Sequence, residues 1–166
     1  LLGYAGLYQT TPPDDPTMDA FLEERFARHQ RFGLLQITRY NSEGVGVQSF
    51  STSPQPPPTG SLALPPDYRK WAQNPEQRGH LLLSQTFDYP GPPWKGRRVM
   101  RFVTPLYWGK TPQFAGVLEF LIDPLFICGK VTADVRSGQT GYAWIIDQNL
   151  IMLAHYEKEF VGHEAM

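Results

Sequence analysis

The chain has 166 residues, of which 41% are hydrophobic, 13% aromatic and 19% charged, so we predict one domain with a substantial hydrophobic core. The net charge of -1 implies no basic face, and a nucleic-acid partner is therefore not expected. A single cysteine, Cys128, excludes an internal disulfide and a cysteine-based zinc cluster, and no apolar run reaches the roughly 18 residues of a membrane span.

The first element predicted with clear boundaries is an amphipathic helix over residues 18–30. Thr17 is a suitable N-cap for it. Residues 1–9 are apolar and aromatic and predict the end of a longer helix, which the prolines up to Pro16 interrupt. The side chains that recur at helical spacing are those of Met18, Phe21, Leu22, Phe26 and His29.

Two strands and a loop follow this helix. The strands are predicted at 32–40 and 45–52, with the turn Asn41-Ser42-Glu43-Gly44 between them. The stretch 53–66 is rich in proline, which excludes a regular helix and a central strand. We therefore predict a surface loop there.

Two further helices are predicted from their end signals. Residues 67–74 predict a short helix that ends at Asn74-Pro75. A long helix is predicted over 125–137, because Asp123-Pro124 supplies an N-cap and a proline at the first position and Gly138 a C-terminal stop. Strands are predicted at 80–87, 97–108 and 114–122.

The end of the chain predicts a β-hairpin. Two apolar, β-branched and aromatic runs flank the polar pair Gln148-Asn149, and Asn149 can adopt the left-handed conformation of a two-residue turn. Such a turn would pair Ile146 with Ile151, Trp144 with Leu153 and Tyr142 with His155 across the sheet.

This element order indicates an α+β fold of the PAS-like type. Its centre would be a mostly antiparallel sheet of five to seven strands, on which the N-terminal helix, the short helix and the long helix pack. The closing hairpin also resembles the Cache family, the extracytoplasmic sensor domains of bacterial chemoreceptors and histidine kinases. The residues that match the family pattern are Gly141, Tyr142, Asp147, His155 and Gly162. Leu150 and Tyr156 depart from it, since the family has a turn glycine and a proline there.

The Cache resemblance implies that residues 1–166 are a single sensor domain from a longer, membrane-anchored protein. The domain would lie on the extracytoplasmic (periplasmic) face of the membrane, and its parent would be a histidine kinase, a chemoreceptor or a cyclic-dinucleotide enzyme. The resemblance implies a small-molecule ligand, such as an organic acid or an amino acid, and a homodimer formed through flanking helices. No catalysis by the domain itself, no cofactor and no metal are expected.

A candidate ligand site begins at Tyr68-Arg69-Lys70-Trp71-Ala72, which resembles the Arg-x-Trp-Tyr segment of many ligand-binding Cache domains. By this resemblance Arg69 binds a carboxylate and Trp71 encloses the ligand. A guanidinium offers the fork that pairs with a carboxylate. Ala72 replaces the second aromatic, which weakens the case for an amino acid and leaves a carboxylate. The alternative is that Trp71 fills the core and Arg69 forms a surface ion pair.

Strand residues are expected to complete the same cavity. They are Ser84, Thr86, Arg101, Thr104, Tyr107 and Tyr142. Arg101 interrupts an apolar strand, so its side chain either reaches solvent or meets an anion in a pocket.

Two other functions stay open at the level of sequence. The chain lacks a nucleophile elbow, a P-loop, a dinucleotide fingerprint and a zincin motif, so it does not point to an enzyme. A cytoplasmic PAS-like module that holds haem or flavin is one alternative. A ligand-free dimerisation domain is the other.

Overall fold

The computed structural model describes Pro12 and residues 15–138 and 140–165. The helix predicted over residues 1–9 lies outside this part of the chain. The helices described are α2 (Pro16–His29), α3 (Pro66–Gln73) and α4 (Pro124–Thr132). The long strands are β1 (Leu34–Asn41), β2 (Gly46–Ser51), β5 (Arg98–Trp108) and β6 (Gln113–Ile122). The short strands are β3 (Leu82–Leu83), β4 (Phe87–Asp88), β7 (Arg136–Ser137), β8 (Gly141–Tyr142), β9 (Ile145–Ile146) and β10 (Met152–Ala154).

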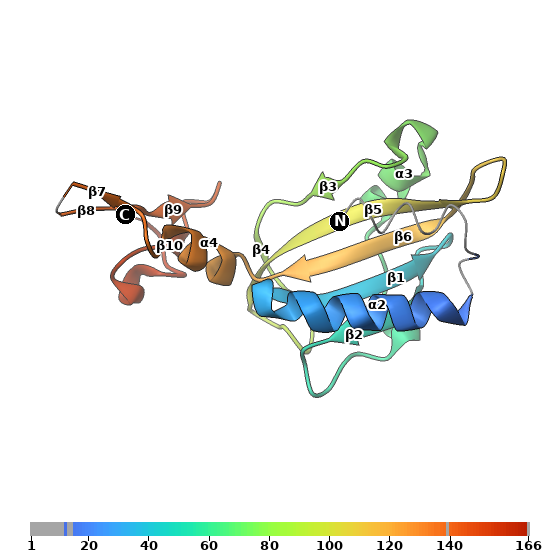
Figure 1. The fold of residues 1–166 in the computed structure, drawn as a ribbon, viewed down its shortest axis with the longest axis horizontal. Helices are drawn as coiled ribbons and strands as arrows, with labels where there is room; N and C mark the ends of the chain where they lie inside the picture. Colours follow the sequence, from blue (N-terminus) through green and yellow to red (C-terminus); the bar gives the residue numbers. More distant parts are fainter. Residues whose placement is uncertain (1–11, 13–14, 139, 166) are drawn as a thin grey trace.

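A six-stranded antiparallel sheet forms the centre of the molecule (Figure 1). Its order is β2-β1-β6-β5-β3, and β4 also pairs with β5. The architecture confirms the predicted α+β fold with a mostly antiparallel sheet. None of the helices in the described residues is both long enough and apolar enough to cross a membrane.

Helix α2 covers one face of this sheet. Asp15 caps it by accepting a hydrogen bond from the Thr17 backbone N–H at 2.8 Å, so the N-cap lies two residues before the predicted one. The inward side chains of Met18, Leu22 and Phe26 are buried against strand residues such as Phe120. Burying each contributes about 1.5–3 kcal/mol to stability.

The opposite face of the sheet packs against α3 and the proline-rich loop. Alternation along the strands separates the two faces, so Phe120 points toward α2 while Val117 and Val103 point toward α3. Ala72 of α3 and Leu62 and Leu64 of the loop complete this second cluster. The polar site described below lies on this face.

The strand predicted over 80–87 is interrupted in its middle. Leu82 and Leu83 pair with β5, and Phe87 and Asp88 pair with it again further along. Between these pairs the Ser84 hydroxyl accepts a hydrogen bond from the Arg101 backbone N–H at 2.9 Å, so a side chain replaces part of the backbone ladder.

Helix α4 begins as predicted, with Asp123 as its N-cap, but ends at Thr132 rather than near Ser137. Its last turn contains β-branched residues, and the Thr132 hydroxyl donates back to the Cys128 carbonyl at 2.9 Å, which weakens a helix end. The chain then turns into β7, which pairs with β8. Gly138 lies in the turn between these strands instead of closing a helix.

The closing hairpin exists, but its predicted register is wrong. Strands β9 and β10 pair Ile146 with Met152 and Ile145 with Ala154, across the loop from Asp147 to Ile151. Leu150, rather than Asn149, has the left-handed conformation, with φ 61°. The Asp147 carboxylate fixes this longer turn, and the shift moves every cross-strand partner.

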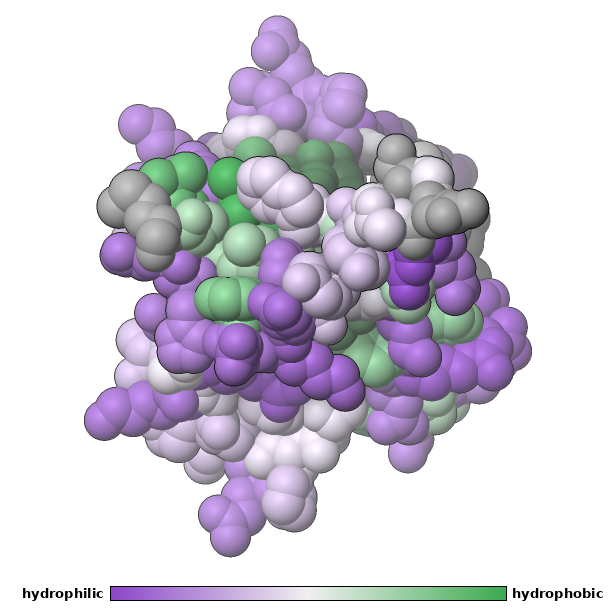
Figure 2. Space-filling view, turned by 90° about the vertical axis from the view of Figure 1, so that its left-hand side faces the viewer, coloured by the Kyte–Doolittle hydropathy of each residue, from purple (hydrophilic) through white to green (hydrophobic). Residues whose placement is uncertain are grey.

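Residues 133–138 and 140–165, here called the C-terminal lobe, lie beyond one end of the sheet (Figure 1). Figure 2 looks onto this end of the molecule and shows green hydrophobic surface among purple hydrophilic groups. Side chains of the lobe that contribute exposed apolar surface include Tyr142, Trp144, Leu150 and Tyr156. This lobe therefore buries its apolar residues less completely than the sheet does.

Candidate functional site

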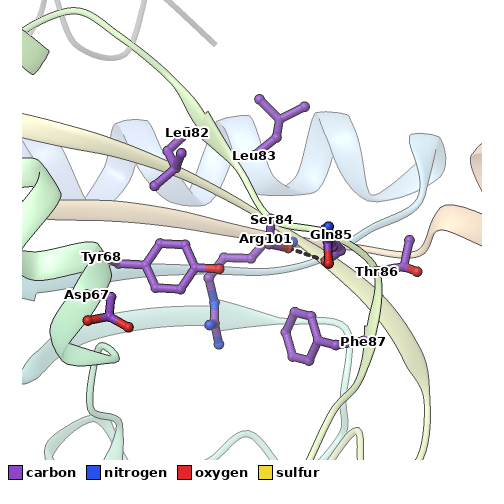
Figure 3. Close-up of a pocket in the computed structure, with 9 residues that line it drawn as sticks. All are labelled: Asp67, Tyr68, Leu82, Leu83, Ser84, Gln85, Thr86, Phe87 and Arg101. Atoms are coloured by element: carbon purple, nitrogen blue, oxygen red, sulfur yellow. Dashed lines mark hydrogen bonds between the residues drawn. The ribbon is translucent and has the colours of Figure 1, made fainter. Parts of the chain in front are cut away.

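A hollow of about 550 Å³ opens between α3 and the strands β3 to β5 (Figure 3). We call it the Arg101 hollow. Prolines fix its position, because Pro65 and Pro66 begin α3 and Pro75 follows its end. Its lining residues are Asp67, Tyr68, Leu82, Leu83, Ser84, Gln85, Thr86, Phe87 and Arg101.

The Arg101 side chain lies in the middle of this hollow, between two aromatic rings (Figure 3). The guanidinium carbon is 5.1 Å from the ring centre of Tyr68 and 5.1 Å from that of Phe87. Such contacts stabilise a cation and fix its plane. Nε of Arg101 donates to Glu119, whereas the two terminal nitrogens have no hydrogen-bond partner among the described residues. They remain as donors for a bound group.

Glu119, a buried residue of β6, holds the Arg101 side chain in place. Its side chain is only 5% exposed, and it accepts hydrogen bonds from Arg101 and from the Tyr40 hydroxyl, the latter at 2.6 Å. Burial acts to lower the pKa of Arg101, but the charge and hydrogen bond of Glu119, together with Tyr40 and Tyr68, outweigh it and raise that pKa. Burial, followed by Glu119, raises the pKa of Tyr40. The cluster is therefore a cation, an anion and a protonated phenol.

A second hollow, of about 600 Å³, lies beside the first, and Arg101 belongs to both linings. We call it the proline hollow, because two proline-rich segments, 55–65 and 89–93, form most of its lining. Tyr40 and Tyr89 provide its aromatic surface. The Arg101 guanidinium is thus accessible from two sides.

Three of the residues predicted for the site line the Arg101 hollow, namely Ser84, Thr86 and Arg101. Arg101 does meet an anion, but this anion is the protein's own Glu119. Thr104 and Tyr107 do not line either hollow. Their hydroxyls donate to the backbone carbonyls of His80 and Ala72, so both have structural partners.

Arg69 and Trp71 also lie outside both linings. The Arg69 guanidinium donates to the Glu43 carbonyl at 2.8 Å, which places it over the turn between β1 and β2. Trp71 packs beside the core cluster that contains Ala72. Tyr142 lies in the C-terminal lobe, stacked on Tyr156 with ring centres 3.9 Å apart.

Sequence reasoning assigned no role to Tyr68, Phe87 or Glu119, although Tyr68 begins the segment that was predicted to bind the ligand. A signal for Glu119 was present, because it is a lone acid in an apolar strand and Arg101 interrupts the apolar run of residues 99–103 in the preceding strand. Two such strands joined by a short turn place opposite charges close together on one face. Nothing comparable distinguished Tyr68 or Phe87 from other aromatic residues.

Thr86 faces away from Arg101 toward the C-terminal lobe. Its hydroxyl donates to Asp147, and both side chains are buried. Burial acts to raise the pKa of Asp147, but hydrogen bonds from Thr86, Ile151 and Asn149 outweigh it and hold the pKa below its ordinary value of 3.8. The positive charge of Arg98 acts in the same direction.

The lowered pKa predicts how the turn at Asp147 responds to acid. Its contribution to stability is complete above pH 3.8, where the unfolded carboxyl is ionised, and is lost as the pH falls through the lower folded pKa. We expect amide exchange at Asn149 and Ile151 to accelerate only below pH 3.8, as the folded Asp147 carboxylate becomes protonated. NMR exchange measurements from about pH 5 to about pH 2 test this, with Asp147→Asn as the control that lacks the transition.

Comparisons with known proteins agree with this architecture. No family model and no curated protein matches the chain. Among solved structures, the ligand-binding domain of the Pseudomonas aeruginosa PAO1 amino acid chemoreceptor PctB, in complex with L-Gln, matches with a TM-score of 0.58 and 17% identity over 98% of this chain and 62% of that one. The PctC domain from the same organism, in complex with GABA, has a TM-score of 0.59 and 16% identity over 96% of this chain and 66% of that one.

A sensor of another class shares the fold. The extracellular domain of the histidine kinase mmHK1S-Z2 matches with a TM-score of 0.61 and 14% identity, over 96% of this chain and 64% of that one. The chain thus spans about three-fifths to two-thirds of the length of these neighbours. The chain therefore has the α+β, Cache-like fold of the extracellular ligand-binding domains of chemoreceptors and histidine kinases.

Proposed function

We propose that the chain is an extracytoplasmic sensor domain of a membrane-anchored signalling protein, a histidine kinase or a chemoreceptor, and that it binds a small carboxylate at Arg101. The observation that carries this proposal is the state of Arg101, a partly buried cation whose plane is held by two rings and whose terminal nitrogens lack protein partners among the described residues. A guanidinium prepared in this way can bind a carboxylate without further ordering.

Other groups in the Arg101 hollow favour a ligand that also carries an ammonium group. The exposed Asp67 carboxylate belongs to the same lining as Arg101, and the rings of Tyr68 and Phe87 lie in the same hollow (Figure 3). An amino acid or an ω-amino acid has these two charges at a short separation. The shared fold supports this class, since the neighbouring domains were solved with L-Gln and with GABA.

The role we propose is binding rather than catalysis. Ligand binding would shift the balance between conformations of the domain and thereby act on the rest of a homodimeric, membrane-anchored parent. The fold shared with extracellular domains supports the extracytoplasmic placement.

Calorimetric titration of the chain with L-glutamine, GABA, L-arginine, L-serine and L-asparagine tests the proposal. With a ligand that binds, Arg101→Lys is expected to weaken affinity about 10- to 100-fold, because lysine keeps the charge beside Glu119 but loses the fork. Arg69→Lys is the matched control and should leave affinity unchanged, since Arg69 bonds to the Glu43 carbonyl. The reverse pattern would assign the site to Arg69 instead, and no binding of any of the five compounds would contradict the amino-acid class.

A further inference from the structure

The wall of the Arg101 hollow is joined to the C-terminal lobe through Thr86. The Thr86 hydroxyl donates to Oδ2 of Asp147, and the Thr86 carbonyl accepts from the Gln148 side chain at 3.1 Å. Within the described residues, these are the two hydrogen bonds between the lobe and the sheet, and both involve Thr86. One residue therefore carries the polar connection between the two parts.

On the lobe side, Asp147 divides its two oxygens between separate tasks. Oδ1 accepts from the backbone N–H groups of Asn149 at 2.8 Å and Ile151 at 2.9 Å, which shapes the turn between β9 and β10. Oδ2 accepts from Thr86. A displacement of Thr86 therefore acts on the carboxylate that fixes the turn, in which Leu150 is held at φ 61°.

On the hollow side, the neighbours of Thr86 touch Arg101 directly. Ser84 is hydrogen bonded in both directions to the Arg101 backbone, at 2.9 Å and 2.8 Å, and Phe87 places its ring over the guanidinium. Segment 84–87 is thus held at Arg101 on one side and at Asp147 on the other. The Thr86–Asp147 contact is buried, so breaking it without a replacement partner is costly.

We infer that the Thr86–Asp147 contact couples the Arg101 hollow to the closing hairpin, and that Asp147 is a positioning residue for the wall of the hollow. The ligand part of this inference rests on the proposed function. A ligand that orders segment 84–87 also orders the turn at Asp147. By the reciprocity of coupled equilibria, the factor by which the ligand favours the ordered turn equals the factor by which the ordered turn strengthens ligand binding. Disturbing the turn therefore weakens ligand binding.

Hydrogen exchange at single amides separates this inference from the proposed function. Without any ligand, Thr86→Val should accelerate exchange of the Asn149 and Ile151 amides about fivefold or more, because it removes the contact to Oδ2 and leaves the Oδ1 bonds intact. Gln148→Met removes the second bond from the lobe side, outside the hollow, and should accelerate exchange across 84–87. Gln113→Met, the same change at an exposed site at the start of β6, should alter neither segment.

The ligand arm uses L-glutamine, with GABA as the second probe. Either one, if bound, should slow exchange at Asn149 and Ile151 in the wild type, and this slowing should be lost in the Thr86→Val/Gln148→Met double variant. Slowing confined to 84–87 in the wild type would overturn the coupling. If neither probe binds, the variant arm still decides, since unchanged exchange at Asn149 and Ile151 in Thr86→Val overturns the inference on its own.

Discussion

Glu119→Gln is expected to lower the free energy of unfolding by about 3–5 kcal/mol, the range for breaking a buried ion pair by removing one partner. Arg101, whose side chain is only 12% exposed, would keep its charge without a carboxylate beside it. Tyr40 would also exchange an anionic acceptor for a neutral one. Urea denaturation measures the loss, and the midpoint of thermal unfolding should fall by about 2–4 °C for each kcal/mol.

Glu24→Gln provides a matched control for this prediction. Glu24 also pairs with an arginine, Arg28, at 2.6 Å, but both side chains are more than half exposed. Its loss should cost about 0–1 kcal/mol. The double variant Arg101→Met/Glu119→Leu should recover most of the stability, since an apolar pair leaves no buried charge. Equal effects of Glu119→Gln and Glu24→Gln would show that the buried pair does not stabilise the fold.

The Arg101–Glu119 pair also shows what a binding site requires of the fold. A buried ion pair is weak evidence for stability, because an apolar pair of similar volume often serves as well. Retaining the pair beside the two hollows that Arg101 lines has a use if Arg101 must present its terminal nitrogens in a fixed plane. The double variant separates these roles, since it should fold and yet not bind a carboxylate.

Local signals in the sequence were sufficient for most elements. The apolar spacing from Met18 to Phe26, the turn at Asn41–Gly44 and the cap at Asp123-Pro124 each depend on neighbours a few residues away. The end of α4 and the register of the closing hairpin depend on contacts that periodicity does not record. In the hairpin, the deciding group is the Asp147 side chain, which lengthens the turn.

The candidate site was predictable only in part, for a geometric reason. Successive residues on a helix point about 100° apart, so a small change in the rotation of α3 decides which side chain enters the hollow. Tyr68 faces Arg101, whereas the next residue, Arg69, lies over the turn at Gly44. Arg101 of β5 was easier to place, because alternation along the strand assigns it to the same face as Val103.

Gly116→Ala is expected to cost about 2–6 kcal/mol, from backbone strain and from overpacking together. Gly116 has φ +138°, and a Cβ atom there would lie 2.0 Å from the Tyr40 carbonyl oxygen. The pairing of β5 and β6 shifts at this point, because Leu106 pairs with Gly116 and Tyr107 with Phe114. An added methyl group must therefore separate β6 from β1 or remove this bulge.

The same displacement would reach the candidate site, because Tyr40 is the strand residue whose hydroxyl donates to Glu119. We therefore expect Gly116→Ala to unfold well below the wild-type midpoint, as followed by circular dichroism. We also expect it to lose ligand binding, as measured by calorimetry. Gly60→Ala is the control, since a Cβ atom at Gly60 meets nothing within 4 Å, and its effect should stay within about 0.5 kcal/mol. Wild-type stability in Gly116→Ala would contradict this prediction. It would mean that β1 and β6 can separate at Tyr40 without losing the backbone hydrogen bonds between them.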